Sequence, residues 1–87
     1  PFPLNLKLYM THPDVKKLQE YLNTHGFPLT QEGPGSMGQE TEKFGALTWY
    51  ALTRFQEAHT TEILVPLGET RGTGFFGPMT RGYINMH

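Results

Sequence analysis

The stretch Phe44–Gln56, FGALTWYALTRFQ, decides the fold of this chain. At about 100° per residue, four apolar side chains of this stretch and that of Ala58 fall within one arc of about 140°, the width of a core-facing stripe. The members of this stripe are Leu47, Ala51, Leu52, Phe55 and Ala58, whereas Thr53, Arg54 and Glu57 fall outside it. We therefore predict an amphipathic helix from Gly45 to about His59.

The residues that begin this helix recur later in the chain. Phe44-Gly45-Ala46-Leu47-Thr48 aligns at a spacing of 32 with Phe76-Gly77-Pro78-Met79-Thr80, and Val15–Glu20 aligns at a spacing of 37 with Leu52–Glu57. In the first unit, Phe can pack before the helix cap, Gly suits the cap, and Thr at the third helical position can bond back toward it. The second unit places a glutamine, Gln19 or Gln56, beside an apolar stripe. The chain therefore contains an internal pseudo-repeat built on helix entries.

A second helix is predicted from about Pro13 to Asn23. The four residues Thr11-His12-Pro13-Asp14 have the pattern of a capping box, with proline in the first turn. Apolar residues then recur at the spacing of one helix face, at Val15, Leu18 and Leu22. Gly26 follows where a left-handed C-terminal cap is needed, and Pro28 prevents the helix from resuming.

The remaining segments are one short helix, two long loops and an N-terminal arm. A third helix starts at Gly77-Pro78 and carries Met79, Tyr83 and Ile84 on one side. Residues 26–44 and 60–76 are predicted to be irregular, with a short paired strand or hairpin near Gly74-Phe75. In residues 1–10, Leu4, Leu6 and Leu8 alternate with polar residues, which is typical of an extended arm lying on the bundle.

Composition excludes several classes of function. Seven basic and eight acidic residues give a formal charge of −1, a poor match for nucleic acid. The absence of cysteine excludes disulfides and cysteine-based metal centres, and the four histidines lack metal-ligand spacing. The longest apolar run, residues 63–65, is far shorter than the roughly twenty residues of a membrane span. We expect no bound metal and no nucleic-acid or membrane partner.

A glycine pattern in the first loop suggests a nucleotide site, but its surroundings lack the groups that would bind a nucleotide. Residues 33–38, GPGSMG, spell Gly-x-Gly-x-x-Gly. A nucleotide site needs a preceding strand, a following amphipathic helix and free amides, and Pro34 has no amide hydrogen. Ser36, the only serine, lacks the surroundings of a nucleophile. Because so small a bundle offers little cleft in which to bury a catalytic carboxyl, we expect no enzyme activity and no cofactor.

Three motifs in order resemble the peptidoglycan-binding domain of the three-helix type. They are Val15-x-x-Leu18-Gln19-x-x-Leu22-x-x-x-Gly26, Phe44-Gly45-x-x-Thr48-x-x-Ala51-Leu52-x-x-Phe55-Gln56, and Gly74-x-Phe76-Gly77-Pro78-x-Thr80. The resemblance covers about Thr11 to Asn85. It implies an all-α fold, a small orthogonal three-helix bundle with long irregular loops, occupying residues 11–87 after the arm of residues 1–10.

The same resemblance implies a function. It is that of a non-catalytic module, monomeric and located in the cell envelope or outside the cell, which binds peptidoglycan through its glycan strand or stem peptide. Such a module targets a covalently linked hydrolase or envelope protein to the wall. The alternative is a protein-interaction or regulatory domain that keeps the fold without binding the wall.

The candidate ligand site is an aromatic platform on the helix of residues 45–59. Trp49 projects away from the apolar stripe, close to Thr53 and Gln56, and a flat apolar face edged by polar groups suits a sugar or peptide. Phe44, Phe76 and Gln19 complete the predicted site. Each assignment has a structural alternative. A loop could cover Trp49, and the two phenylalanines could be core residues. The glutamines could donate hydrogen bonds to carbonyl groups of the loops.

Overall fold

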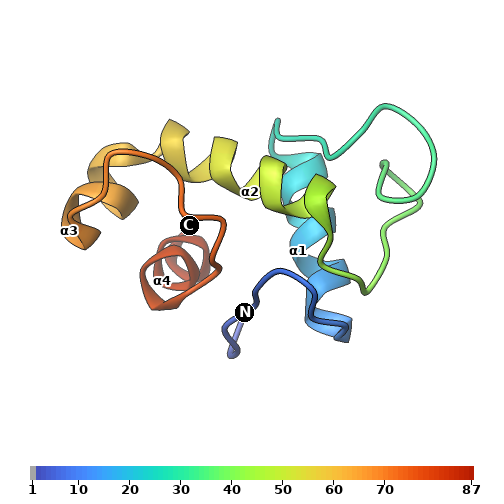
Figure 1. Ribbon diagram of the computed structural model, residues 1–87, viewed down its shortest axis with the longest axis horizontal. Helices are drawn as coiled ribbons and strands as arrows, with labels where there is room; N and C mark the ends of the chain where they lie inside the picture. Colours follow the sequence, from blue (N-terminus) through green and yellow to red (C-terminus); the bar gives the residue numbers. More distant parts are fainter. Residues whose placement is uncertain (1) are drawn as a thin grey trace.

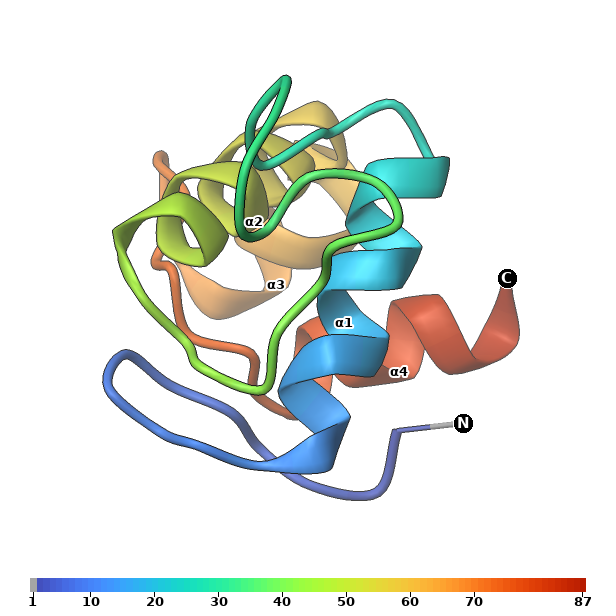
Figure 2. The same cartoon turned by 90° about the vertical axis from the view of Figure 1, so that its right-hand side faces the viewer.

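The computed structural model describes residues 2–87, whose regular elements are all helices, and its radius of gyration is 11.8 Å. Its elements are α1 (Pro13–Thr24), α2 (Ala46–Ala58), the π-helical turn η1 (Thr60–Leu64), α3 (Val65–Leu67) and α4 (Pro78–Met86). In Figure 1, α2 runs across the view and α4 is seen end-on, whereas in Figure 2 α4 runs across the view. The prediction of an all-α fold built on three steeply crossed helices is confirmed. None of the helices in this described part of the chain has the length and apolar character that a bilayer crossing requires.

The first helix has the predicted extent, but its cap differs. His12, and not Thr11, is the N-cap, and its Nδ1 accepts a hydrogen bond from the backbone N–H of Asp14 at 3.0 Å. Thr11 is instead paired with Lys43 in an antiparallel bridge. Because that pairing holds Thr11 extended, the helix starts one residue later than a capping box on Thr11 requires. Gly26 has a φ of +90°, as its predicted place after the helix demands.

The second helix buries a more polar face than its apolar pattern predicts. Leu47 is 45% exposed and Ala58 is also exposed, so both assignments to the core stripe are wrong. Thr48 and Gln56 are buried in their place, at 1% and 0% exposure. A polar side chain can occupy a core position when its hydrogen bonds are satisfied. Thr48 accepts from Gln19 on α1, and Gln56 bonds to the second loop and to Thr80 on α4.

The segment after α2 contains more helix than predicted. Its first half forms η1 and α3, which bury Ile63 and Leu64 but leave Val65 63% exposed. The pairing expected near Gly74-Phe75 is a single bridge at Phe76, and the alternative of a hairpin is wrong for the described residues. Among residues 2–87, strand-like pairing is limited to two isolated antiparallel bridges, and the one in this region joins Leu6 to Phe76.

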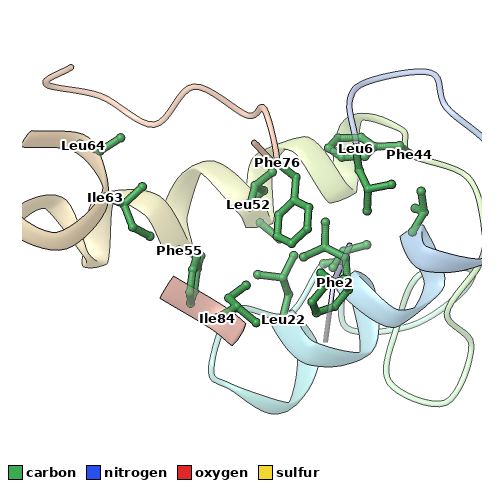
Figure 3. Packing of buried hydrophobic residues seen from close by; sticks show 14 residues of the cluster. Phe2, Leu6, Leu22, Phe44, Leu52, Phe55, Ile63, Leu64, Phe76 and Ile84 are labelled. Atoms are coloured by element: carbon green, nitrogen blue, oxygen red, sulfur yellow. The ribbon is translucent and has the colours of Figure 1, made fainter. Parts of the chain in front are cut away.

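The N-terminal segment closes the core across both repeat units. The backbones of Leu6 and Phe76 exchange two hydrogen bonds of 2.9 and 3.0 Å, and that of Phe44 bonds to Tyr9 and Met10. The Leu6 side chain is fully buried, and Figure 3 shows it between the rings of Phe44 and Phe76. The ring of Phe2 meets that of Phe76 edge-on at 5.1 Å. This segment therefore holds together the loops that precede α2 and α4.

Candidate functional site

The second loop is held by one buried amide, that of Gln56 on α2. Its Nε2 donates to the carbonyl of Phe75 at 3.0 Å, to the Thr80 hydroxyl at 3.1 Å and to the Thr73 hydroxyl at 3.3 Å. Its Oε1 accepts from the backbone N–H groups of Thr73 at 2.9 Å and Gly74 at 3.0 Å. This side chain, fully buried, thereby fixes the chain that leads into α4.

Gln19 on α1 makes the matching contacts in the first repeat unit. Its Nε2 donates to the carbonyl of Lys43 at 3.1 Å and to the hydroxyls of Thr48 and Thr41 at 2.9 and 3.4 Å, while its Oε1 accepts from the Thr41 N–H at 2.7 Å. Thr41, Lys43 and Thr48 precede Thr73, Phe75 and Thr80 by 32 residues each. The sequence repeat is therefore also a repeat of hydrogen bonds, in which a glutamine on one helix holds the entry of the next.

Four of the six residues predicted to contact ligand lie inside the protein. Gln19 and Gln56 are at most 1% exposed and tie the loops, while Phe44 and Phe76 are fully buried in the core. In this arrangement their side chains position the loops and expose almost no surface to a ligand. The threonine of each entry accepts from a glutamine, and the glycine caps of α2 and α4 receive no side-chain hydrogen bond.

The Trp49 platform is covered by the second loop. A Cβ atom at Gly74 would overlap the indole nitrogen of Trp49, so the backbone of this glycine lies directly against the ring. Thr53 is 8% exposed, and its hydroxyl donates to the carbonyl of Tyr50 at 2.8 Å. The structure thus brings Trp49, Thr53 and Gln56 together beneath residues 72–74, with Trp49 half-buried, and not on an open face.

A cleft of about 260 Å³ opens instead where the first loop leads into α2. We call it the α2-entry cleft; it is lined by Leu29, Pro34, Gly35, Thr41, Lys43, Ala46 and Leu47, with Gln19, Gly45 and Thr48 behind them. The exposed Lys43 makes no ion pair within residues 2–87, and the exposed Leu47 lies opposite Leu29 across Gly35. The cleft therefore combines a free ammonium group with apolar walls.

The outer wall of this cleft is held by Asn23 and Glu40. The Nδ2 of Asn23 donates to the carbonyl of Gly35 at 3.0 Å and to Oε2 of Glu40 at 2.8 Å, and its Oδ1 accepts from the N–H of Leu29 at 3.0 Å. The hydrogen bond from Asn23 favours the carboxylate and lowers the pKa of Glu40. Glu40 also accepts from the N–H of Gly38. These hydrogen bonds hold the loop of residues 29–40 in place as one wall of the cleft.

Sequence reasoning missed the lining of the α2-entry cleft. Lys43 and Leu47 belong to the repeated helix entry, but the helical wheel assigned Leu47 to the core and gave no reason to select Lys43. The GPGS turn at residues 33–36, whose glycine pattern resembles that of a phosphate-binding loop, contributes Pro34 and Gly35 to a wall of the cleft. In the described part of the chain, no cluster of three His, Asp or Glu side chains could hold a metal ion.

Comparison with known proteins finds a family match. The family model described as "Putative peptidoglycan binding domain" matches residues 11–62, which include every residue that lines the α2-entry cleft. No curated protein and no solved structure matches the chain significantly.

Proposed function

The chain belongs to the peptidoglycan-binding domain family, and from that premise we propose that it is a non-catalytic module that holds a parent envelope protein or hydrolase on the cell wall. Its place of action would be the cell envelope or the extracellular side. The observation that carries the proposal is the family match over residues 11–62, which spans the whole α2-entry cleft.

The chemistry of the α2-entry cleft suits the stem peptide of peptidoglycan. Stem peptides carry free carboxylates and small methyl side chains. Lys43 supplies an unpaired cation, and the first turn of α2 adds amides that no side chain caps. Leu29 and Leu47 supply apolar walls for methyl groups. We place the carboxylate beside Lys43 and a methyl group between the leucines.

Binding at this cleft is expected to be weak for one module. The cleft is small and open, so it buries little area, and much of the gain is offset by the lost freedom of the ligand. An exposed ion pair at Lys43 adds up to about 1 kcal/mol, which salt screens. Such a module works by raising the local concentration of a linked partner near the wall.

A pull-down with purified sacculi tests the proposal. Lys43→Ala should reduce the bound fraction about threefold to fivefold at low salt, whereas Lys7→Ala, which removes an exposed lysine from the N-terminal arm, should leave it unchanged. A stem peptide should shift the amide resonances of Gly35 and Leu47. Failure of the wild-type domain to bind sacculi would contradict the proposal and favour the protein-interaction alternative.

A further inference from the structure

The entry of α4 forms a second cleft, of about 190 Å³, at the position that the repeat makes equivalent to the first. We call it the α4-entry cleft; it is lined by Leu67, Glu69, Thr73, Phe75, Gly77, Pro78, Met79 and Thr80. Six of these residues, from Thr73 to Thr80, follow by 32 positions six residues that line the α2-entry cleft. Figure 1 shows the two helix entries that hold the clefts. Each of the two helix entries, held by a buried glutamine, thus forms a cleft at equivalent positions.

Two differences between the clefts each remove a contact for an anion. Phe75 stands where the first cleft has Lys43, so the cation is replaced by an aromatic ring. Pro78 stands where the first cleft has Ala46, and proline has no N–H to offer. The α4-entry cleft therefore does not repeat the carboxylate site proposed above.

The same cleft gains a negative charge and more apolar surface. Glu69 is exposed and makes no ion pair within residues 2–87. Its backbone is fixed, because its N–H donates to the carbonyl of Leu64 at 3.0 Å after the left-handed turn at Gly68. Three apolar residues face solvent around it: Leu67 is 46%, Phe75 42% and Met79 37% exposed. An unpaired carboxylate therefore borders an apolar hollow.

We propose that the α4-entry cleft binds the side chain of a diamino acid in the wall peptide, an aliphatic chain that ends in a primary ammonium group. The methylene groups lie against Leu67, Phe75 and Met79, and the ammonium group reaches the carboxylate of Glu69. The Phe75 ring, packed over Gly77, adds a face to which a cation is attracted. This inference rests on the proposed function. In it, the α2-entry cleft binds a carboxylate of the peptide and the α4-entry cleft binds its ammonium group.

The inference is tested by titrating the 15N-labelled domain with a lysine-containing stem peptide and with the same peptide acetylated at its side-chain amine. The free peptide should shift the amide resonances of Glu69, Thr73, Phe75 and Met79, and acetylation should weaken binding about threefold to fivefold. Glu69→Gln should remove most of the difference between the two peptides. Glu20→Gln, which removes an exposed carboxylate on α1, is the matched control and should preserve it.

Three results would overturn the inference. Equal binding of the free and acetylated peptides to the wild-type domain would remove the amine from recognition. Shifts confined to the α2-entry cleft, in a domain that still binds sacculi, would refute the second cleft while leaving the proposed function intact. Equally tight binding of a lysine peptide of unrelated sequence would show that the cleft does not select the wall peptide. The amine would then come from a protein segment. Failure of sacculus binding would instead refute the proposed function itself.

Discussion

Replacing Gln56 with methionine tests whether one buried amide holds the loop that leads into α4. Methionine has nearly the same length and volume, so Gln56→Met removes hydrogen bonds without opening a cavity. Five hydrogen bonds are lost, to Thr73, Gly74, Phe75 and Thr80. The unfolded chain hardly changes, because both side chains are solvated there.

The expected loss of stability follows from which partners stay buried. The N–H of Gly74 and the hydroxyl of Thr80 meet Gln56 in buried contacts, whereas the contacts with Thr73 and Phe75 are partly open to water. A stranded buried polar group costs about 1–3 kcal/mol, and a group that water can reach costs much less. Since the Thr80 hydroxyl can turn toward a carbonyl of its own helix, we expect a total loss of about 2–4 kcal/mol.

Urea denaturation measures this loss. With a slope of about 1 kcal/mol per molar urea for a small domain, the midpoint should fall by about 2–4 M. Gln31→Met, at an exposed residue, is the control and should change the free energy of unfolding by less than about 0.5 kcal/mol. Amide exchange at Thr73 and Gly74 should accelerate in folded Gln56→Met. A midpoint shift below about 0.5 M would refute the reasoning, because the loop would then be held by other contacts.

Three further predictions concern the loops and the arm. Gly74→Ala should destabilise the domain by at least about 2 kcal/mol and shift the fluorescence of the single tryptophan, because φ is +71° and the new Cβ would overlap Trp49; unchanged fluorescence would contradict the covering of the ring. Leu6→Ala should cost about 2–5 kcal/mol in urea denaturation while Leu4→Ala, at 42% exposure, costs little, and equal losses would contradict the packing of the arm. The pKa of Glu40 is lowered by the hydrogen bond from Asn23, so this carboxylate stabilises the fold at a pH above the ordinary pKa of a glutamate. The contribution is lost as the pH falls through the lower pKa of the folded state. Urea midpoints of Glu40→Gln should therefore lie below wild type at neutral pH and converge with it in acid, and a gap independent of pH would contradict the assignment.

The helices could be predicted because their signals are local. Proline in the first turn, glycine after the last and apolar residues at helical spacing placed α1 within one residue of its observed ends. The Phe-Gly entries placed the starts of α2 and α4, at Ala46 and Pro78. These signals act through backbone geometry within a few residues, so they do not depend on the rest of the fold.

The buried face of α2 could not be predicted in the same way. A helical wheel ranks side chains by apolar character, which places Leu47 inside and Gln56 outside. In the folded chain Gln56 is buried, because groups of the second loop and of α4, 17 to 24 residues away in sequence, satisfy its amide. Leu47 is exposed because it lines a cleft whose other wall comes from residues 29–35. Both outcomes depend on contacts between distant segments.

The sequence by itself determined that this is an all-α chain with two equivalent helix entries, since capping and periodicity depend only on residues that are close in the sequence and the repeat can be found by aligning the sequence with itself. Only the tertiary structure decided what the repeated glutamines and aromatic residues do. The buried side chains of Gln19 and Gln56 hydrogen-bond to the two helix entries, and the second loop covers Trp49. The physical reason is that a buried polar group takes whichever partner the folded chain brings within hydrogen-bond distance, and that partner lies far away in the sequence.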